Sequence, residues 1–187
     1  MQPKIQFHIL GWITFLLFPT IAFLALWFFE DIHFLEILEL DNIFTLLTLV
    51  GLAFGLLYGI VILGLTQFPI FEEMSSKQER ILKSLNLGWG DVFFMSFCAG
   101  FGEEILFRAG IQTWLGPWLT TFIFIAIHGY FNPLSWKQSM MGVVLFPFIL
   151  SLAYAYESYG LWFCVAAHFS YDLIMFSMAL KSTDKQF

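Results

Sequence analysis

The chain has 187 residues, of which 59% are apolar and 12% charged, and its mean hydropathy is +0.81. Soluble domains carry about 25% charged residues, so the composition excludes an ordinary soluble protein and indicates an integral membrane protein. The formal net charge of −6 argues against nucleic acid as a partner. Spans of about 20 residues leave room for about five to seven transmembrane helices. We therefore expect a single integral membrane domain over residues 1–187.

Six apolar stretches follow one another along the chain. They cover, approximately, residues 9–29, 43–68, 91–115, 118–130, 138–156 and 160–180. The fourth stretch is short for a full crossing, and Gly116-Pro117 predicts a tight turn before it. The pattern predicts an all-α, polytopic membrane helix bundle of about six transmembrane helices.

The charges between these stretches predict the orientation of the bundle. Residues 30–41 carry five acids and no Lys or Arg, whereas residues 72–86 contain Lys77, Arg80 and Lys83. Lys and Arg near span ends stay in the cytoplasm, so residues 72–86 are expected inside, as an amphipathic interfacial helix. With six spans, both termini are also expected to be cytoplasmic.

Three glycines in the second stretch are spaced four residues apart, at Gly51, Gly55 and Gly59. Glycines at this spacing lie on one face of a helix and leave it smooth. We expect another helix to pack closely against this face.

A cluster of three charges, Glu103, Glu104 and Arg108, interrupts the third apolar stretch. Each charge near the bilayer centre costs roughly 2.5–3.5 kcal/mol on insertion scales, so such groups need partners or a function. In a helix Glu104 and Arg108 lie four residues apart and can form an ion pair, which is equally well explained as a packing device. Glu103 points about 100° away from that pair. An intramembrane carboxylate without a local counter-ion indicates a functional site.

Three further ionisable residues lie in later stretches: His128, His168 and Asp172. His168 and Asp172 are four residues apart, so the carboxylate can orient the imidazole. At about 1.5 Å per residue from the outer span ends, Glu103, His128 and His168 lie roughly 18, 15 and 12 Å deep. One carboxylate and two imidazoles at similar depth predict a site that activates water.

These residues form three short motifs in chain order. The motifs are Glu103-Glu104-x-x-x-Arg108, Phe124-x-x-x-His128 and His168-x-x-x-Asp172. They resemble the EExxxR, FxxxH and HxxxN/D motifs of the CAAX protease and bacteriocin-processing enzyme family, also called the CPBP or Abi family. Each motif is weak alone, but the three in order on successive spans are a strong signal. The resemblance covers about residues 89–180, which we take as the expected catalytic core.

The resemblance implies an intramembrane endopeptidase that cleaves a peptide bond with water activated by Glu103 as general base. The other motif residues would support it: Glu104 and Arg108 by shaping the site, His128 and His168 by holding water and stabilising the oxyanion, and Asp172 by orienting His168 or joining the oxyanion site. The expected partners are the lipid bilayer and a membrane-embedded or membrane-surface protein or peptide, such as a CAAX-type tail or a C-terminal sorting signal. A prokaryotic cytoplasmic membrane is the expected location.

Other readings of the same residues stay open at this point. Glu103, His128 and His168 also make a three-ligand zinc set, although no HExxH is present. We expect no cofactor, with zinc as the alternative. Intramembrane acids and histidines also mark proton- or ion-coupled transporters, although no inverted repeat is visible. A catalytically silent immunity or partner-binding protein is the third reading, and the retention of every motif residue argues against it.

Overall fold

The chain folds into a bundle of helices, and the computed structural model describes residues 3–71, 84–133 and 135–181. No strand occurs among these residues. The helices are α1 (Pro3–Glu30), α2 (Phe34–Leu38), η1 (Leu40–Asn42), α3 (Leu46–Thr66), α5 (Trp89–Glu104), η2 (Ile105–Ile111), α6 (Gln112–Ile127), α7 (Trp136–Tyr159) and α8 (Leu161–Lys181). The interfacial helix expected over residues 72–86 lies mostly outside the described residues.

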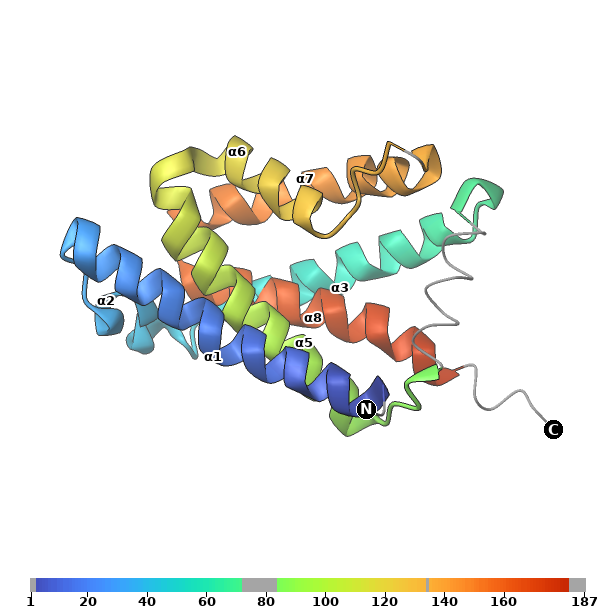
Figure 1. Cartoon of the computed structure of the whole chain (residues 1–187), viewed down its shortest axis with the longest axis horizontal. Coiled ribbons are helices and arrows are strands. Elements are labelled where there is room, and N and C mark those ends of the chain that lie inside the picture. The colour runs from blue at the N-terminus through green and yellow to red at the C-terminus, as the bar shows by residue number, and fades with distance from the viewer. Residues whose placement is uncertain (1–2, 72–83, 134, 182–187) are drawn as a thin grey trace.

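Five helical segments in the described chain are long and apolar enough to cross a membrane. The third of them, Trp89–Ile127, joins α5, η2 and α6 and therefore contains the third predicted stretch and most of the fourth, which was expected to reach residue 130. Gly116 has a non-helical backbone there, with φ 67° and ψ 173°. Glycine tolerates this positive φ, and Pro117 follows it with the fixed φ of a helix start. The all-α polytopic fold is thus confirmed, with the predicted turn seen as a sharp bend (Figure 1).

The bend turns α6 back along α7, so that the two helices lie side by side (Figure 1). The first residues of α1 and the last residues of α8 lie toward the same end of the bundle (Figure 1). The predicted six crossings would require this arrangement. The cytoplasmic location of that end stays a prediction.

The predicted glycine face of α3 packs against α8, which is the most extensive helix pair in the bundle. A Cβ atom on Gly51 would meet the carbonyl of Phe163, and one on Gly55 would meet the carbonyl of Ala167. The closeness of the two backbones also lets Ser170 Oγ donate to the carbonyl of Leu52 at 2.9 Å. The glycine face therefore fixes the position of α8, the helix that carries His168 and Asp172.

We expect Gly55→Ala to lower the unfolding free energy by about 1–3 kcal/mol, the usual cost of overpacking a tight contact. The added methyl group has no room between α3 and the Ala167 carbonyl. Thermal unfolding in detergent measures the change. Gly64→Ala is the matched control in the same helix, because a Cβ at Gly64 has no neighbour within 4 Å among the described residues. Equal stability of the two variants would contradict the proposed packing.

Helix α1 lies along α5 and η2 and covers the segment that carries the charge cluster. A Cβ on Gly102 would meet the backbone carbonyl of Thr14, and one on Gly110 would come within 3.2 Å of the Ala22 Cβ. Ala22 and Leu26 of α1 are each only 1% exposed. This close cover shields the intramembrane charges from the lipid side of α1.

Candidate active site

The charge cluster lies where α5 passes into η2, a π-helical turn. π-Helical turns within α-helices are rare and are frequent at functional sites. Arg108 Nε donates to Glu104 Oε2 at 2.8 Å, and both side chains have no exposed surface. The ion pair predicted from their spacing is therefore present.

Glu104 has a second partner, which lies on α8. Its Oε1 is 2.7 Å from His168 Nδ1. The carboxylate is ionised against Arg108 and can only accept, so the Nδ1 of His168 carries the proton. His168 Nε2 then faces Asp172 Oδ2 across 3.7 Å. Glu104 therefore orients His168 from one side, while Asp172 faces its other nitrogen.

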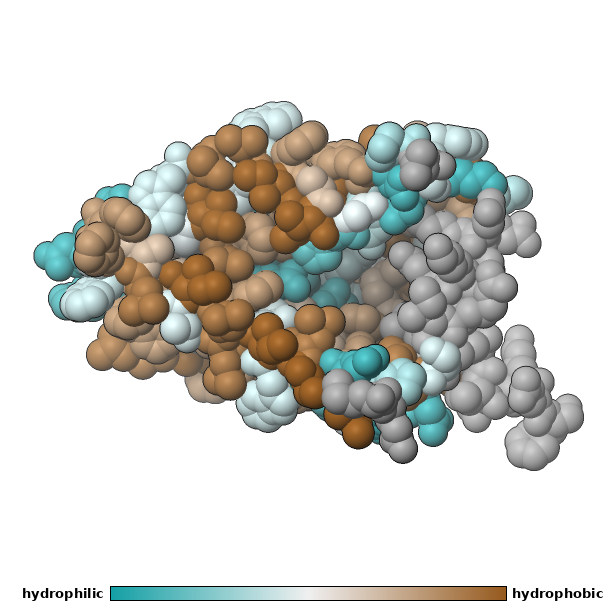
Figure 2. All heavy atoms as spheres, in the orientation of Figure 1, coloured by the Kyte–Doolittle hydropathy of each residue, from teal (hydrophilic) through white to brown (hydrophobic). Residues whose placement is uncertain are grey.

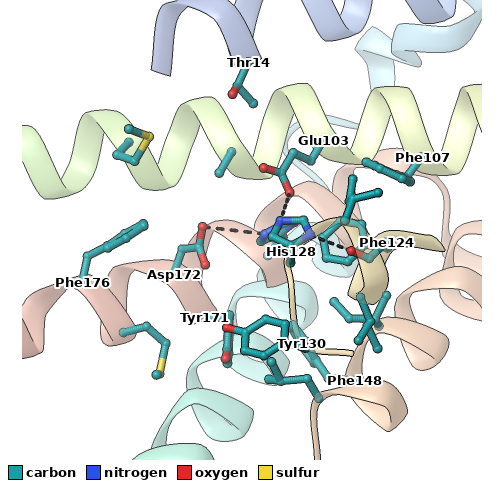
Figure 3. Close-up of a pocket in the computed structure, with 18 of the residues that line it drawn as sticks. Thr14, Glu103, Phe107, Phe124, His128, Tyr130, Phe148, Tyr171, Asp172 and Phe176 are labelled. Carbon is teal, nitrogen blue, oxygen red and sulfur yellow. Dashed lines mark hydrogen bonds and ion pairs between the residues drawn. The ribbon is translucent and has the colours of Figure 1, made fainter. Parts of the chain in front are cut away.

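His128 lies immediately after the last residue of α6. The helix ends there because Gly129 adopts φ 77°, a conformation that favours glycine at a helix C-terminus. His128 Nδ1 donates to the carbonyl of Phe124 at 2.7 Å, since a carbonyl can only accept. This bond leaves His128 Nε2 pointing at Glu103 Oε2, which is 3.5 Å away (Figure 3).

The site thus contains two pairs in which an imidazole nitrogen faces a carboxylate oxygen. They are Glu103 with His128 and Asp172 with His168. Both imidazoles use Nδ1–H for another contact, so in the neutral ring each Nε2 is an acceptor. An ionised carboxylate is also an acceptor, and two acceptors at this distance need a proton or a water donor between them. Glu103 Oε2 is buried and makes no hydrogen bond within the described part of the chain. The geometry suits the uptake and release of protons.

Both pairs line one cavity of about 690 Å³. Most of its wall is apolar and comes from α1, α5, α6, α7 and α8, and Figure 3 shows Glu103, His128 and Asp172 grouped on its surface. Figure 2 shows hydrophilic surface recessed between hydrophobic ridges on the face where α5 and α6 lie. The predicted site residues Glu103, His128, His168 and Asp172 are therefore brought together, and Glu104 and Arg108 lie behind them.

Phe124, which was predicted only as part of a motif, and two tyrosines also take part in the site. The ring of Phe124 stacks on His128 with 4.4 Å between centroids, and the guanidinium of Arg108 lies 5.8 Å from the same ring. Tyr130 and Tyr171 line the cavity across from Glu103 (Figure 3). No sequence signal points to the tyrosines, because their place depends on how the helices pack.

The alternative zinc set is not assembled. Within residues 3–71, 84–133 and 135–181, no three His, Cys, Asp or Glu side chains meet so that they could hold a metal ion. The reason is the direction of the imidazoles: His128 Nε2 faces Glu103, whereas His168 Nε2 faces Asp172 and its Nδ1 is bonded to Glu104. Glu103, His128 and His168 therefore do not fit a shared ion in this arrangement.

We expect Arg108→Met to lower the unfolding free energy by about 3–5 kcal/mol, because it leaves the buried carboxylate of Glu104 without its counter-ion. Thermal unfolding of the purified protein in detergent measures the loss. The double variant Glu104→Gln with Arg108→Met removes both charges, so its loss should be much smaller than that of Arg108→Met. A double variant that is less stable than Arg108→Met would contradict the ion-pair account.

The comparisons with known proteins agree with the motifs. Residues 85–174 match the family model described as type II CAAX prenyl endopeptidase Rce1-like. Over 83 residues the chain is 34% identical to the uncharacterized protein YpbD of Bacillus subtilis (strain 168), covering 44% of this chain and 42% of that protein. The chain thus spans less than half the length of this curated relative. No solved structure matches the chain significantly. The predicted family resemblance is confirmed, and it supports a protease of the CAAX intramembrane kind.

Proposed function

We propose that this integral membrane protein, whose residues 85–174 match the Rce1-like family model, is an endopeptidase that cleaves a peptide bond within or at the membrane with water activated by Glu103. One observation carries the proposal. The buried Oε2 of Glu103 faces His128 Nε2 across 3.5 Å on the wall of a mostly apolar cavity. A carboxylate oxygen that makes no hydrogen bond within the described residues is available as a base for a water molecule.

In the first half of the reaction, Glu103 accepts a proton from the water. The water oxygen forms a bond to the scissile carbonyl carbon, and the electron pair of the C=O bond moves to the oxygen. His168 takes onto Nε2 the proton that lies between this nitrogen and Asp172, so that the ring becomes positively charged, and it donates this proton in a hydrogen bond to the oxyanion. A charged donor in a site of low dielectric stabilises developing negative charge strongly.

In the second half, the tetrahedral intermediate collapses and the C–N bond breaks. The leaving nitrogen must take up a proton, and the proton held between Glu103 and His128 is the nearest source. Its transfer through His128 restores Glu103 as a base. The reaction consumes one water, and every proton step uses groups of the chain itself.

The cavity indicates what kind of substrate the site would accept. Aromatic and Met side chains line much of it, among them Phe7, Phe18, Met175 and Phe176. An apolar peptide segment that is already in the bilayer or at its surface would enter such a cavity without losing favourable contacts with water. We therefore propose a membrane-associated protein or peptide of the CAAX or C-terminal processing type as substrate, cleaved in the cytoplasmic membrane of a prokaryotic cell.

The direct test is cleavage by the purified protein in liposomes that also hold membrane-anchored peptides. With oxygen-18 water as solvent, mass spectrometry should find the heavy oxygen in the new C-terminal carboxylate of the product. A metal chelator should leave the rate unchanged if protein groups alone carry the reaction. Loss of cleavage on chelation that added zinc restores would contradict the glutamate mechanism.

The same liposomes test the transporter reading. A pH-sensitive dye inside sealed vesicles should show no proton flux above that of empty vesicles. Flux that requires Glu103, together with no cleavage of any anchored peptide, would overturn the proposed function.

A further inference from the structure

A chain of buried polar contacts continues beyond Arg108, away from the cavity. Gln112, the first residue of α6, is only 5% exposed. Arg108 Nη1 donates to Gln112 Oε1 at 3.5 Å. Gln112 Nε2 donates to the carbonyl of Ala153 on α7 at 2.8 Å. The guanidinium of Arg108 is thus linked to a helix that supplies no residue of the predicted motifs.

The orientation of the Gln112 amide follows from its partners. The Ala153 carbonyl can only accept, so the amide nitrogen must face it, and the guanidinium can only donate, so the amide oxygen must face Arg108. The second hydrogen of Nε2 points toward Glu157 Oε1 at 3.5 Å. Every contact favours the same amide orientation, so Gln112 presents its oxygen to Arg108 Nη1 in a fixed position.

The position of Arg108 in turn decides the state of His168. Arg108 keeps Glu104 ionised, and ionised Glu104 holds the proton of His168 on Nδ1. That tautomer leaves Nε2 facing Asp172 and the cavity. A guanidinium free to rotate away would weaken the Glu104 contact and let His168 adopt the other tautomer.

We propose that Gln112 is a positioning residue for the reaction: anchored on α7, it holds Arg108 against Glu104 and so keeps His168 Nε2 directed at the substrate. This inference rests on the proposed function, which it deepens. Gln112 touches no reacting atom. Its effect should therefore fall on kcat, with little change in KM.

The experiment compares three variants with the wild type, all in the full-length protein. Gln112→Met keeps the size of the side chain and removes its polar contacts. Gln112→Glu with Glu157→Gln keeps an acceptor for Arg108 but loses the bond to the Ala153 carbonyl, and the new amide at position 157 on α7 can donate to the new carboxylate at position 112 in its place. Thr113→Val is the matched control, because the exposed Thr113 donates at 2.8 Å to the backbone carbonyl of Ala109 and not to Arg108 or Glu104.

Two readouts are measured, cleavage kinetics and the tautomer of His168 from nitrogen-15 histidine NMR. Gln112→Met should lower kcat by about tenfold, since a misplacement of about 1 Å can cost up to about 10²-fold in rate, and should move His168 toward the other tautomer. The exchanged double variant, held on α7 through residue 157 instead of the Ala153 carbonyl, should recover part of the kcat and the original tautomer. Thr113→Val should match the wild type in both readouts.

Wild-type kcat in Gln112→Met, or a lower kcat with an unchanged His168 tautomer, would overturn the inference. If Gln112→Met does not fold, the exchanged double variant decides alone, and a disturbed tautomer in that folded variant would overturn the inference. The NMR readout needs no substrate. A wild type that cleaves nothing would therefore count against the proposed function, while the tautomer would still report on Gln112.

Discussion

Replacing Glu103 by Gln is expected to lower kcat for peptide cleavage by about 10²- to 10⁴-fold, the range that a general base contributes. The amide has the shape of the carboxylate but cannot accept a proton from water. Glu103 Oε2 makes no hydrogen bond in the described residues, so Gln at this position should leave the fold and its thermal unfolding unchanged. Initial rates on an anchored peptide, with unfolding measured on the same preparations, separate the two effects.

The matched control for this prediction is Glu36→Gln. Glu36 is an exposed acid on α2 whose Oε1 accepts from the backbone of His33 at 3.3 Å, and it is not among the residues that line the cavity. Its variant should cleave at the wild-type rate. A Glu103→Gln protein that cleaves as fast as Glu36→Gln would remove the base from the proposed mechanism.

Much of the fold could be predicted because a membrane helix must satisfy its own backbone hydrogen bonds and cover about 20 apolar residues. The stretch predicted over residues 43–68 is α3, Leu46–Thr66, and the glycine face found from spacing alone packs against α8. The partner of that face could not be predicted, because spacing shows only that a helix can approach. The change from α-helix to π-helix at Ile105 could not be predicted either, because the pattern of apolar residues is the same on both sides of it.

The site shows the same division between local and long-range contacts. Pairs four residues apart, such as Glu104 with Arg108, follow from helix geometry and were predicted correctly. The bond from His168 to Glu104 joins residues 64 positions apart, and only the packing of α8 on α5 creates it. The contact between Arg108 and Gln112 could have been predicted but was not. Gln112 is a polar residue in an apolar segment and lies four residues after Arg108, on the same face of a helix. The catalytic roles themselves stay predictions until kinetics test them.

The long-range bond between Glu104 and His168 leads to the second large expected effect. His168→Ala should lower kcat by about 10²- to 10³-fold, the usual loss when a donor to an oxyanion is removed. Glu104→Gln should also lower kcat, because the amide cannot hold His168 by charge and leaves Arg108 without its counter-ion. His8→Ala is the control histidine, since His8 pairs with Asp91 at the far end of α1 and should leave kcat unchanged.

The decisive comparison is between His168→Ala and the double variant Glu104→Gln with His168→Ala. If Glu104 acts through His168, removing both should cost no more in kcat than His168→Ala alone, because residues that act as one unit are not additive. Rates are compared below the unfolding temperature of the least stable variant. The loss of stability that follows from breaking the Glu104–Arg108 ion pair then does not lower the measured rates. Losses that multiply in the double variant would mean that Glu104 acts on the reaction independently of His168, and the orienting role read from the 2.7 Å contact would be wrong.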